Sequence, residues 1–590
     1  MKQFFNSFLG TIAGIIVSVF ILFLILAGIA VSLVNSSTSD KPLLVKANSI
    51  LQIKLDKEIT ERATDNPFGN LSFVSKSLES KTGLNEILKN IQKAKTDNNI
   101  KGIYLDLSVI RAGIATVEEI RNVLIDFKTS GKFIISYGEI YTQKAYYLAS
   151  VADRVYLNPQ GTLEWKGLSA QIMFFKGTLD KLEIDVQIFR HGKFKSAIEP
   201  FNLDAMSVSN RKQTRAYIGA IWNHILEGVS ASRKIDAAAL NNFAGNMLIQ
   251  NAEDAVKYNL ADSIQYKDEV LANIKKRLSL GREEKINFVD IDDYTKAPEI
   301  KKLTTSKDKI AIVYAVGTIE GGEGEEETVG SEGISKAIRD AHTDTNVKAI
   351  VLRINSPGGS ALASDIIWRE VFLAQKSKPV VVSMADVAAS GGYYIACAAD
   401  AIVAQPNTIT GSIGVFGILP NAKKFFNDKL GITFDTVNTN KHADLGAIYR
   451  PVNSEEALVV QKSVETIYQA FISKVAQGRK MSVASVDSIG QGRVWSGVDA
   501  KAIGLVDELG GIETALKLAA KKAHIENYKI LSLPKQKTAI EKLLKQINGE
   551  VESKIVAKEL GEYSEYYQQL KASINFKGIY ARMPYEVVVY

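Results

Sequence analysis

Short apolar runs alternate with longer amphipathic stretches over most of the chain. The runs at residues 350–352 and 380–382 are β-branched or aliphatic throughout, as expected of strands buried on both faces of a parallel sheet. Each run leads into a glycine-rich turn, and a stretch with the period of a helix follows. This order of strand, turn and helix predicts an α/β fold.

The pattern occurs twice along the chain. Lys101 aligns with Lys348 at an offset of 247 residues (348 − 101), and the surrounding segments align without a gap. An earlier strand that begins at Ser49 matches one that begins at Lys309 at an offset of 260 (309 − 49). Self-similarity of this length predicts a duplicated domain rather than a solenoid of small repeats. We therefore expect two tandem α/β domains.

The domain boundaries follow from this duplication and from local composition. We place the first repeat at residues 47–294 and the second at 310–530. The segment 295–309 between them is charged and poor in β-forming residues, which is typical of a linker. Residues 531–590 form an extension. Each repeat has roughly 240 residues, which is enough to bury a core of its own.

The beginning of the chain differs from the rest because it lacks charge. No charged residue occurs between Lys2 and Asp40, and residues 8–34 are almost continuously apolar. At about 1.5 Å per residue, a helix of that length exceeds the roughly 30 Å hydrocarbon core of a bilayer. We therefore predict a single transmembrane anchor at residues 8–34. A cleaved signal peptide is the alternative, although the run is long for one and no clear cleavage site follows it.

One serine stands at the junction of a predicted strand and a predicted helix. Ser390 follows the strand that contains residues 380–382, and Gly391 and Gly392 come directly after it. The two glycines allow a close backbone approach that a Cβ would block. At a helix N-terminus, free N–H groups and the positive end of the dipole favour a developing oxyanion. Ser390 is therefore the best candidate nucleophile; the alternative is a helix N-cap, the commonest role of serine at such a position.

Two more glycine-rich turns follow strand-like runs. Gly358 and Gly359 come after a buried strand and offer backbone N–H groups without side-chain obstruction, as an oxyanion loop requires. The turn TGSIGVFG occupies residues 410–417. Turns that follow successive strands of an α/β sheet converge on one edge, where open sheets place their sites. We expect all three turns to meet there.

A serine nucleophile needs a base. The five histidines show no Ser-His-Asp spacing that can be placed, although triads assemble in space and a histidine base stays open: His191, His224, His342, His442 and His524. The other solution is a lysine kept neutral by burial. Lys195 lies in the apolar context RHGKFKSAIEPF, which makes it a better candidate than most lysines, although any single lysine is ordinarily solvated.

The two halves differ at the positions that carry this chemistry. Ser390 aligns with Gln143, which has no nucleophilic oxygen. Lys195 aligns with Ala443 after a one-residue drift, and Lys441, two residues away, is the runner-up base. One half therefore keeps the base and the other keeps the nucleophile. We expect the pair to form across the two domains of one chain, with pairing across neighbouring subunits as the alternative.

Four segments in combination carry a resemblance to a known family. The segments VAASGGYYIACAAD, INSPGGS, TITGSIGVFG and GKFKSAIEPF resemble those of the signal peptide peptidase A family, also called protease IV, in its long two-repeat form. The resemblance covers about residues 47–525. It implies two crotonase-like or Clp-like α/β domains and a membrane-anchored serine peptidase with a Ser-Lys dyad.

The resemblance also implies roles for individual residues. Ser390 would be the nucleophile, Lys195 the general base, and Ser412 a serine that positions the lysine. Backbone N–H groups of Gly359 and Gly391 would form the oxyanion hole. The family further implies hydrophobic peptide substrates such as cleaved signal peptides, a bacterial inner membrane location with residues 1–7 in the cytoplasm and the catalytic body in the periplasm, and a homo-oligomer, a tetramer.

Composition narrows the function classes. The net charge of +7 is modest for 590 residues, and the absence of a basic stripe argues against nucleic acid as a partner. No metal-ligand spacing or Walker loop occurs in the sequence, so we predict neither metal nor cofactor. The single cysteine, Cys397, lies in an apolar stretch and is interpreted as a small core residue.

Two functions from other classes stay open at this stage. A crotonase-like fold also serves acyl-CoA chemistry, in which two backbone N–H groups polarise a thioester without a serine nucleophile. The chain could also be a catalytically silent membrane scaffold. The presence of both Ser390 and Lys195 argues against a scaffold.

Overall fold

The computed structural model describes residues 10–11, 14–22, 24, 42–63, 81–299, 306–325, 327–536 and 578–583. Most of the predicted anchor at 8–34 lies outside these ranges, as do residues 1–7 and much of the extension at 531–590. Among the described residues, no helix is both long and apolar enough to cross a bilayer. Residues 14–22 are helical, and the anchor itself stays a prediction.

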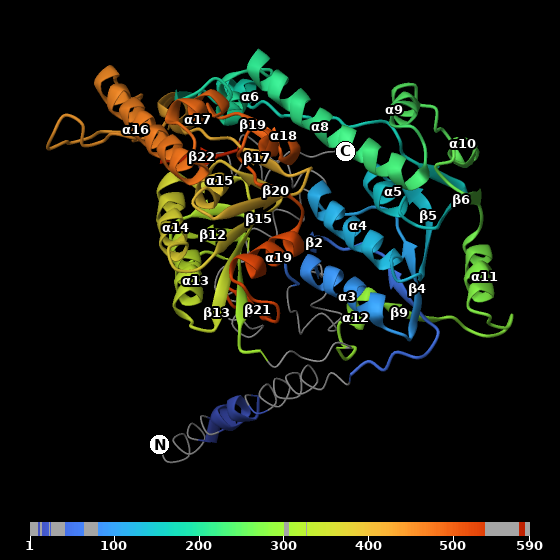
Figure 1. The fold of residues 1–590 in the computed structure, drawn as a ribbon. Helices are drawn as coiled ribbons and strands as arrows, with labels where there is room; N and C mark the ends of the chain where they lie inside the picture. The colour runs from blue at the N-terminus through green and yellow to red at the C-terminus, as the bar shows by residue number, and fades with distance from the viewer. Residues whose placement is uncertain are drawn as a thin grey trace.

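The first repeat is built on a parallel six-stranded sheet, drawn in blue to green in Figure 1. Its strands are, in sheet order, β8 (Ser263–Ile264), β6 (Arg154–Leu163), β5 (Phe133–Tyr141), β4 (Ile100–Asp106), β1 (Ser49–Ile53) and β9 (Asn287–Asp290). Its longer helices are α3 (Leu84–Thr96), α4 (Ile114–Lys128), α5 (Gln143–Ala149), α8 (Val208–Arg233), α9 (Ala237–Gly245), α10 (Ala252–Lys257) and α11 (Lys267–Arg277). Along β1, Leu51 packs with the core under α3 and α4, whereas Ile50 packs with the core under α11. Helices on both faces explain why the strand sequences are apolar at nearly every position.

The second repeat has the same plan and is drawn in yellow to red. Its sheet has the order β19 (Val494–Ser496), β17 (Ile409–Gly411), β15 (Val380–Ala389), β13 (Val347–Ser356), β10 (Lys309–Val316) and β21 (Lys529–Leu533), with β16 (Ala401–Ala404) beside β15 and β20 (Glu508–Leu509) beside β16. Its helices are α13 (Ser331–Thr343), α14 (Ala361–Ala374), α15 (Gly391–Ala396), α16 (Ser454–Arg479), α17 (Val483–Ile489), α18 (Gly497–Ala502) and α19 (Ile512–Lys522). Ala311 and Val313 of β10 face α13, and Ile310 and Ile312 face α19. Both faces of this sheet are therefore buried as well.

The positions of the helices confirm the predicted duplication. Helices α3 and α13 begin at Leu84 and Ser331, an offset of 247 (331 − 84). Helices α8 and α16 each span 26 residues and begin at Val208 and Ser454, an offset of 246 (454 − 208). The expected class, two tandem α/β domains, is therefore the observed one.

The register around Lys195 differs from the sequence alignment. Elements before Lys195 in the first repeat and their counterparts in the second are separated by 247 residues: β6 begins at residue 154 and β16 at residue 401 (401 − 154). Helices α8 and α16, which follow this loop in the two repeats, are separated by 246 residues. Lys195 therefore corresponds to Lys441 or His442, not to Ala443. The second repeat has a lysine within one residue of the equivalent position.

A smaller sheet joins the two repeats. Its order is β12 (Thr328–Gly330), β11 (Thr318–Glu320), β14 (Gly358–Ser360), β22 (Gly578–Arg582), β18 (Phe416–Asn421) and β7 (Asp185–Arg190). The remaining short elements are β2 (Ile59–Thr60), β3 (Thr82–Gly83), α6 (Lys176–Lys181), a 3₁₀ turn (Ser196–Ile198), α7 (Glu199–Asn202), α12 (Ile291–Tyr294) and a π-helical turn (Phe425–Lys429). Because β7 belongs to the first repeat and pairs antiparallel with β18 of the second, backbone hydrogen bonds cross the boundary between the repeats.

Side chains also hold the repeats together. The carboxylate of Asp386, on β15, accepts the N–H groups of Ala115 and Thr116 at the start of α4, at 2.8 and 3.0 Å. Such a carboxylate satisfies free N–H groups at the helix N-terminus and opposes its dipole favourably. Helix α8 of the first repeat extends across the top of both halves in Figure 1 and packs on β19. The loop that carries Lys195 is thereby held against the second repeat.

Candidate active site

Ser390 lies between the end of β15 and the start of α15, as the sequence predicts, and it is fully buried. Its backbone has φ 56° and ψ −112°, which is sterically unfavourable for any residue with a Cβ. The N–H of Ser390 donates to the carbonyl of Gly411 at 2.8 Å, which holds the turn against β17. The hydroxyl makes no capping hydrogen bond to α15. Ser390 is therefore not a side-chain N-cap, the alternative that the sequence left open.

The two glycines after Ser390 are required by close backbone approach. A Cβ on Gly391 would lie 2.6 Å from Ser364 Oγ, and one on Gly392 would lie 2.7 Å from the carbonyl oxygen of Ser356. A side chain at Gly392 would push α15 away from β13, and one at Gly391 would push it away from α14. The glycines thus allow the turn to present Ser390 at the edge of the sheet.

Lys195 comes from the first repeat and reaches Ser390 across the boundary between the repeats. Its Nζ lies 2.7 Å from Ser390 Oγ, 3.1 Å from Ser412 Oγ and 3.2 Å from the Ser412 carbonyl oxygen. Lys195 is fully buried and has no ion-pair partner within the described part of the chain. Burial without a compensating charge lowers the pKa of Lys195 well below its usual value of 10.5.

These contacts suit a neutral amine. A neutral lysine has two N–H donors and one lone pair. The two oxygens of Ser412 can accept the two N–H groups, which leaves the lone pair of Lys195 directed at the Ser390 hydroxyl. The arrangement can therefore take a proton from Ser390.

The loop that carries Lys195 is held by a residue that sequence reasoning did not find. Gln213, on α8, donates to the Phe194 carbonyl at 3.1 Å and accepts the N–H of Val494 in the second repeat at 3.1 Å. A Cβ on Gly492 would lie 2.6 Å from the Cα of Lys195, so the two backbones touch there. A glutamine on an amphipathic helix offers no sequence signal for such a role, because its partners lie far away along the chain.

The three glycine-rich turns meet at one edge of the sheet, because β17, β15 and β13 are neighbours. Ser412 has φ 50° and its N–H donates to the Arg493 carbonyl at 2.7 Å. A Cβ on Gly358 would lie 2.6 Å from the Gly391 nitrogen, so the turn before Gly359 lies directly against the start of α15. The structure therefore brings Lys195, Ser390 and Ser412 into contact, and it sets the turn that contains Gly359 beside Gly391.

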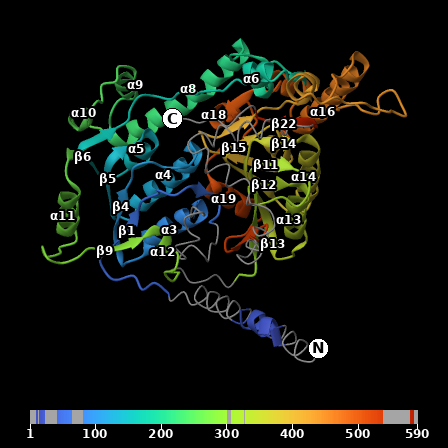
Figure 2. The same cartoon turned by 180° about the vertical axis from the view of Figure 1, so that it is seen from behind.

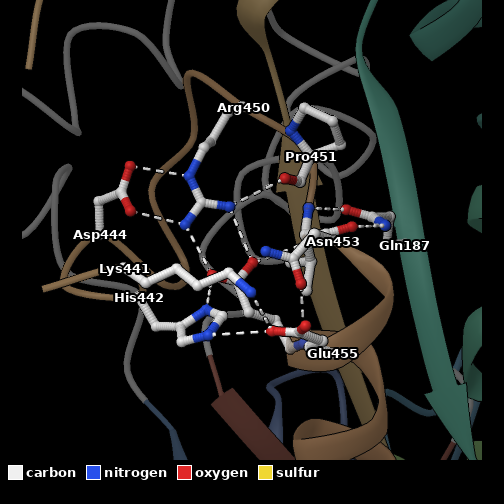
Figure 3. A network of polar contacts seen from close by, with 10 residues as sticks. Gln187, Lys441, His442, Asp444, Arg450, Pro451, Asn453 and Glu455 are labelled. Atoms are coloured by element: carbon white, nitrogen blue, oxygen red, sulfur yellow. Dashed lines mark hydrogen bonds and ion pairs between the residues drawn. The ribbon is translucent and has the colours of Figure 1, made fainter.

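Lys441, the runner-up base, lies elsewhere. Its side chain is 67% exposed and forms an ion pair with Glu455 at 2.5 Å. Figure 3 shows it in a polar network on the surface with His442 and Arg450, where Gln187 of β7 hydrogen bonds to the backbone of Val452. Lys441 makes no contact with Ser390, and its exposure leaves it without the desolvation that acts on Lys195.

No described histidine hydrogen bonds to Ser390. His191 contacts Glu465 at 2.6 Å, and His224 lies 3.2 Å from Glu118. His442 is part of the surface network in Figure 3. A histidine base for Ser390 therefore has no support in the described residues.

Gln143 fills the equivalent turn of the first repeat in a structural role. Its Oε1 accepts the N–H groups of Lys166 and Gly167, both at 2.8 Å, and its Nε2 donates to the Gly167 carbonyl at 2.8 Å. The amide thus closes a loop and presents no nucleophile. Only the second repeat carries a nucleophilic side chain at this turn.

The remaining candidate groups are inert or absent from the described residues. Cys397 is fully buried, and burial raises the pKa of its thiol to about 12. Its hydrogen bond to the Tyr394 carbonyl at 3.2 Å and its apolar surroundings agree with a core residue. Among the described residues, no group of three or more His, Cys, Asp or Glu side chains is arranged to hold a metal ion.

Comparison with known proteins identifies relatives over most of the chain. The model of Peptidase family S49 matches residues 126–281 and 373–526, two segments whose first residues are related by the same offset of 247 (373 − 126). Protease 4 of Salmonella typhi is 34% identical over 557 residues, which cover 92% of this chain and 89% of that protein. The chloroplastic serine protease SPPA of Arabidopsis thaliana is 36% identical over 519 residues, covering 86% of this chain and 74% of that protein.

Solved structures with a weaker likeness cover part of the chain. ClpP1 from Listeria monocytogenes has 20% identity and a TM-score of 0.23, over 34% of this chain and 91% of that one. A mutant of the 1510-N membrane-bound stomatin-specific protease has 16% identity and a TM-score of 0.25, over 39% of this chain and 99% of that one.

Proposed function

The chain belongs to peptidase family S49 and is a serine peptidase, and we propose that Ser390 is its nucleophile and Lys195 its general base. The observation that carries this proposal is the 2.7 Å contact between Lys195 Nζ and Ser390 Oγ. The contact is buried, and none of the described carboxylates lies beside the lysine to keep it protonated. A lysine in such a place is a competent base near neutral pH.

The reaction proceeds in two steps. Neutral Lys195 accepts the proton of Ser390 as its oxygen attacks the peptide carbonyl, and N–H groups of Gly359 and Gly391 stabilise the oxyanion. The lysine ammonium then donates that proton to the leaving amine, which departs and leaves an acyl-enzyme. Lys195, neutral again, takes a proton from water as the water oxygen attacks the acyl carbon. The lysine ammonium then returns this proton to Ser390 Oγ as the bond between that oxygen and the acyl carbon breaks and the acid leaves. The two oxygens of Ser412 hold the lysine in place throughout.

Hydrolysis of an unfolded apolar polypeptide tests this function. The full chain in detergent micelles is expected to cut such a polypeptide at internal positions, seen by mass spectrometry of the products. An acyl-CoA thioester serves as the comparison substrate. Hydrolysis of the thioester without any cleavage of the polypeptide would overturn the peptidase proposal in favour of acyl-CoA chemistry.

Replacing Ser412 with alanine is expected to lower kcat by roughly 10-fold to 100-fold. Lys195 Nζ loses a hydroxyl acceptor 3.1 Å away, so the amine is held less firmly against Ser390. An acceptor favours the ammonium form, so its loss lowers the pKa of Lys195 further and moves the acid limb of the pH profile to lower pH. Ser335→Ala, which removes another buried serine hydroxyl on α13, should leave kcat and the pH profile unchanged. An unaltered pH profile in Ser412→Ala would contradict the positioning role.

We further propose that residues 8–34 anchor the chain in the bacterial inner membrane, with the catalytic body in the periplasm and hydrophobic peptides such as cleaved signal peptides as substrates. The described part of this segment supports an apolar environment. Ile15, Ile16 and Phe20 are 59%, 62% and 59% exposed and contact no protein core. Resistance of the membrane-bound chain to alkaline extraction tests the anchor; release by alkali would rule it out.

We propose that the chain forms a homo-oligomer, a tetramer by resemblance to its family. Within one chain, β7 of the first repeat pairs with β18 of the second. At the offset of 247 that relates the elements before Lys195, the counterpart of β7 in the second repeat is residues 432–437, and the counterpart of β18 in the first repeat is residues 169–174. Ile432 and Phe434 are 45% and 44% exposed. Residues 432–437 form no strand, and in residues 169–174 the only β-pairing is an isolated bridge at Ala170. Copies that pair these segments head to tail would close a ring, and a monomeric mass by light scattering would exclude it.

A further inference from the structure

One strand of the small sheet comes from a distant part of the chain. β22 (Gly578–Arg582) lies between β14 and β18 and is antiparallel to both, as Figure 2 shows beside β14. In the described residues β14 and β18 form no ladder with each other, so two strand spacings, roughly 9 to 10 Å, separate them. Without β22 this gap would present unpaired backbone groups on both sides. Such a gap is the geometry in which proteins bind extended peptides by strand addition.

The gap is beside the Ser390 and Lys195 pair. Strand β14 contains Gly359, and β18 begins at Phe416, four residues after Ser412. The ring of Phe416 lies 5.9 Å from Lys195 Nζ and 6.0 Å from the ring of Tyr580 on β22. β22 therefore packs directly against a residue that lines the buried lysine.

The register of β22 brings a carbonyl to the glycines of the oxyanion hole. The N–H of Met583 donates to the Pro357 carbonyl at 2.7 Å, and two positions along the ladder Ala581 pairs with Gly359. Because hydrogen-bonded pairs alternate in an antiparallel ladder, the Gly359 N–H faces the Ala581 carbonyl. A Cβ on Gly391 would lie 2.9 Å from that same oxygen. The Ala581 carbonyl thus lies close to both glycines that are the predicted oxyanion donors.

The side chains of β22 are seated as those of a bound peptide would be. Ala581 is completely buried and Met583 is 4% exposed. Ile579, on the same face of the strand, packs against the core of the second repeat. Successive side chains of a strand point to opposite faces, so positions 579, 581 and 583 point inward together.

We propose that β22 is an inhibitory strand that occupies the peptide-binding cleft, with the Ala581 carbonyl where the carbonyl of a substrate is attacked. This rests on the proposed peptidase function of Ser390 and Lys195. A substrate binds as an extended strand in the same antiparallel mode, and only after β22 has left the gap. The apparent affinity for substrate is therefore lowered by the fraction of molecules in which the gap is filled.

A point substitution in the full chain tests this inference. Ala581→Glu introduces a charged side chain where even a methyl group is fully buried, which should expel β22. We expect kcat/KM for an unfolded apolar peptide to rise at least about 10-fold. Ala238→Glu makes the same change at an exposed position of α9 and should leave kcat/KM unchanged. A second variant, the chain ending at residue 577, should match Ala581→Glu, whereas a chain ending at residue 583 keeps β22 and should behave as wild type.

Peptide binding separates this inference from the peptidase function. A fluorescent peptide of sequence GIYARM, that of residues 578–583, should bind a chain carrying both Ser390→Ala and Ala581→Glu but not one carrying Ser390→Ala alone, as measured by anisotropy. A scrambled peptide is the control. Equal hydrolysis by wild type and both opened variants, with no peptide binding, would overturn the inhibitory strand and leave the peptidase intact. If the peptide binds selectively but no chain hydrolyses the substrate, the result would support β22 as the occupant of the cleft and would contradict the proposed catalytic roles of Ser390 and Lys195.

Discussion

Replacing Lys195 with methionine, or Ser390 with alanine, is expected to lower kcat/KM for an unfolded apolar peptide by about 10⁴-fold or more. Methionine fills a similar apolar volume, but its thioether is not basic and cannot replace the amine that lies 2.7 Å from Ser390 Oγ. Alanine removes the attacking oxygen. Since the two groups act as a unit, the double variant should be no slower than either single variant.

Controls for this result lie close in sequence. Lys193 is exposed, two residues before Lys195, so Lys193→Met should keep wild-type kcat/KM. Circular dichroism should show the native fold in every variant. Wild-type turnover by a correctly folded Lys195→Met chain would show that another group takes the proton.

The pH dependence follows from the buried lysine. Burial lowers the pKa of Lys195 well below 10.5, so kcat/KM should rise with pH through that lowered value as the amine becomes neutral. Stability depends on pH in the same direction. Between the lowered pKa of Lys195 in the folded chain and 10.5, the unfolded chain binds more protons than the folded chain, so the free energy of unfolding rises with pH. The free-energy cost of burying a charged Lys195 is absent at pH values above the pKa of the lysine in the unfolded chain. It is complete at pH values below the pKa of the lysine in the folded chain. Lys195→Met removes it, so this variant should gain most stability over wild type at low pH, as measured by chemical denaturation.

Replacing Arg353 with methionine is expected to destabilise the joined repeats by about 3 to 5 kcal/mol. Arg353, on β13, is 1% exposed and forms ion pairs with Glu61 at 2.8 Å and Glu119 at 2.7 Å. Both carboxylates belong to the first repeat, so the guanidinium bridges the two halves. Its removal leaves two buried carboxylates without their cation, and burial already raises the pKa of Glu61.

The denaturant midpoint measures this effect. Arg339 pairs with Glu370 on the surface, and its side chain is 57% exposed, so Arg339→Met should leave the midpoint where it is in wild type. Replacing Glu61 and Glu119 with leucine in the Arg353→Met chain should recover much of the loss, because no unpaired charge then stays buried. An unchanged midpoint in Arg353→Met would show that the buried ion pairs do not join the halves.

Several features of the site were readable from local sequence. The buried strand before Ser390 and the two glycines after it predicted a serine at a strand-to-helix junction, and the structure has that junction. The apolar context of Lys195 made it a better candidate for a neutral base than most lysines, and the side chain is fully buried. These signals were available because each depends on residues that are close together along the chain.

Other features had no local signal. Gln213 holds the Lys195 loop through partners in both repeats, and nothing in its helix marks it. The alignment that set Lys195 against Ala443 was wrong because a one-residue difference between the repeats is invisible where the loops have diverged. Arg353 stands in a strand that otherwise reads as apolar, and its carboxylate partners lie more than two hundred positions away.

Hydrophobic periodicity and self-similarity were sufficient to establish the α/β class, the duplication and the three glycine-rich turns, because burial on two sheet faces imposes its pattern on neighbouring residues. The approach of Lys195 to Ser390, separated by 195 positions, depends instead on how the two repeats pack. So does the choice of Lys195 over Lys441, since burial lowers the pKa of one lysine and solvent surrounds the other. The insertion of β22 beside Gly359 is likewise a matter of backbone pairing between distant segments, to which any extended sequence of suitable size could contribute.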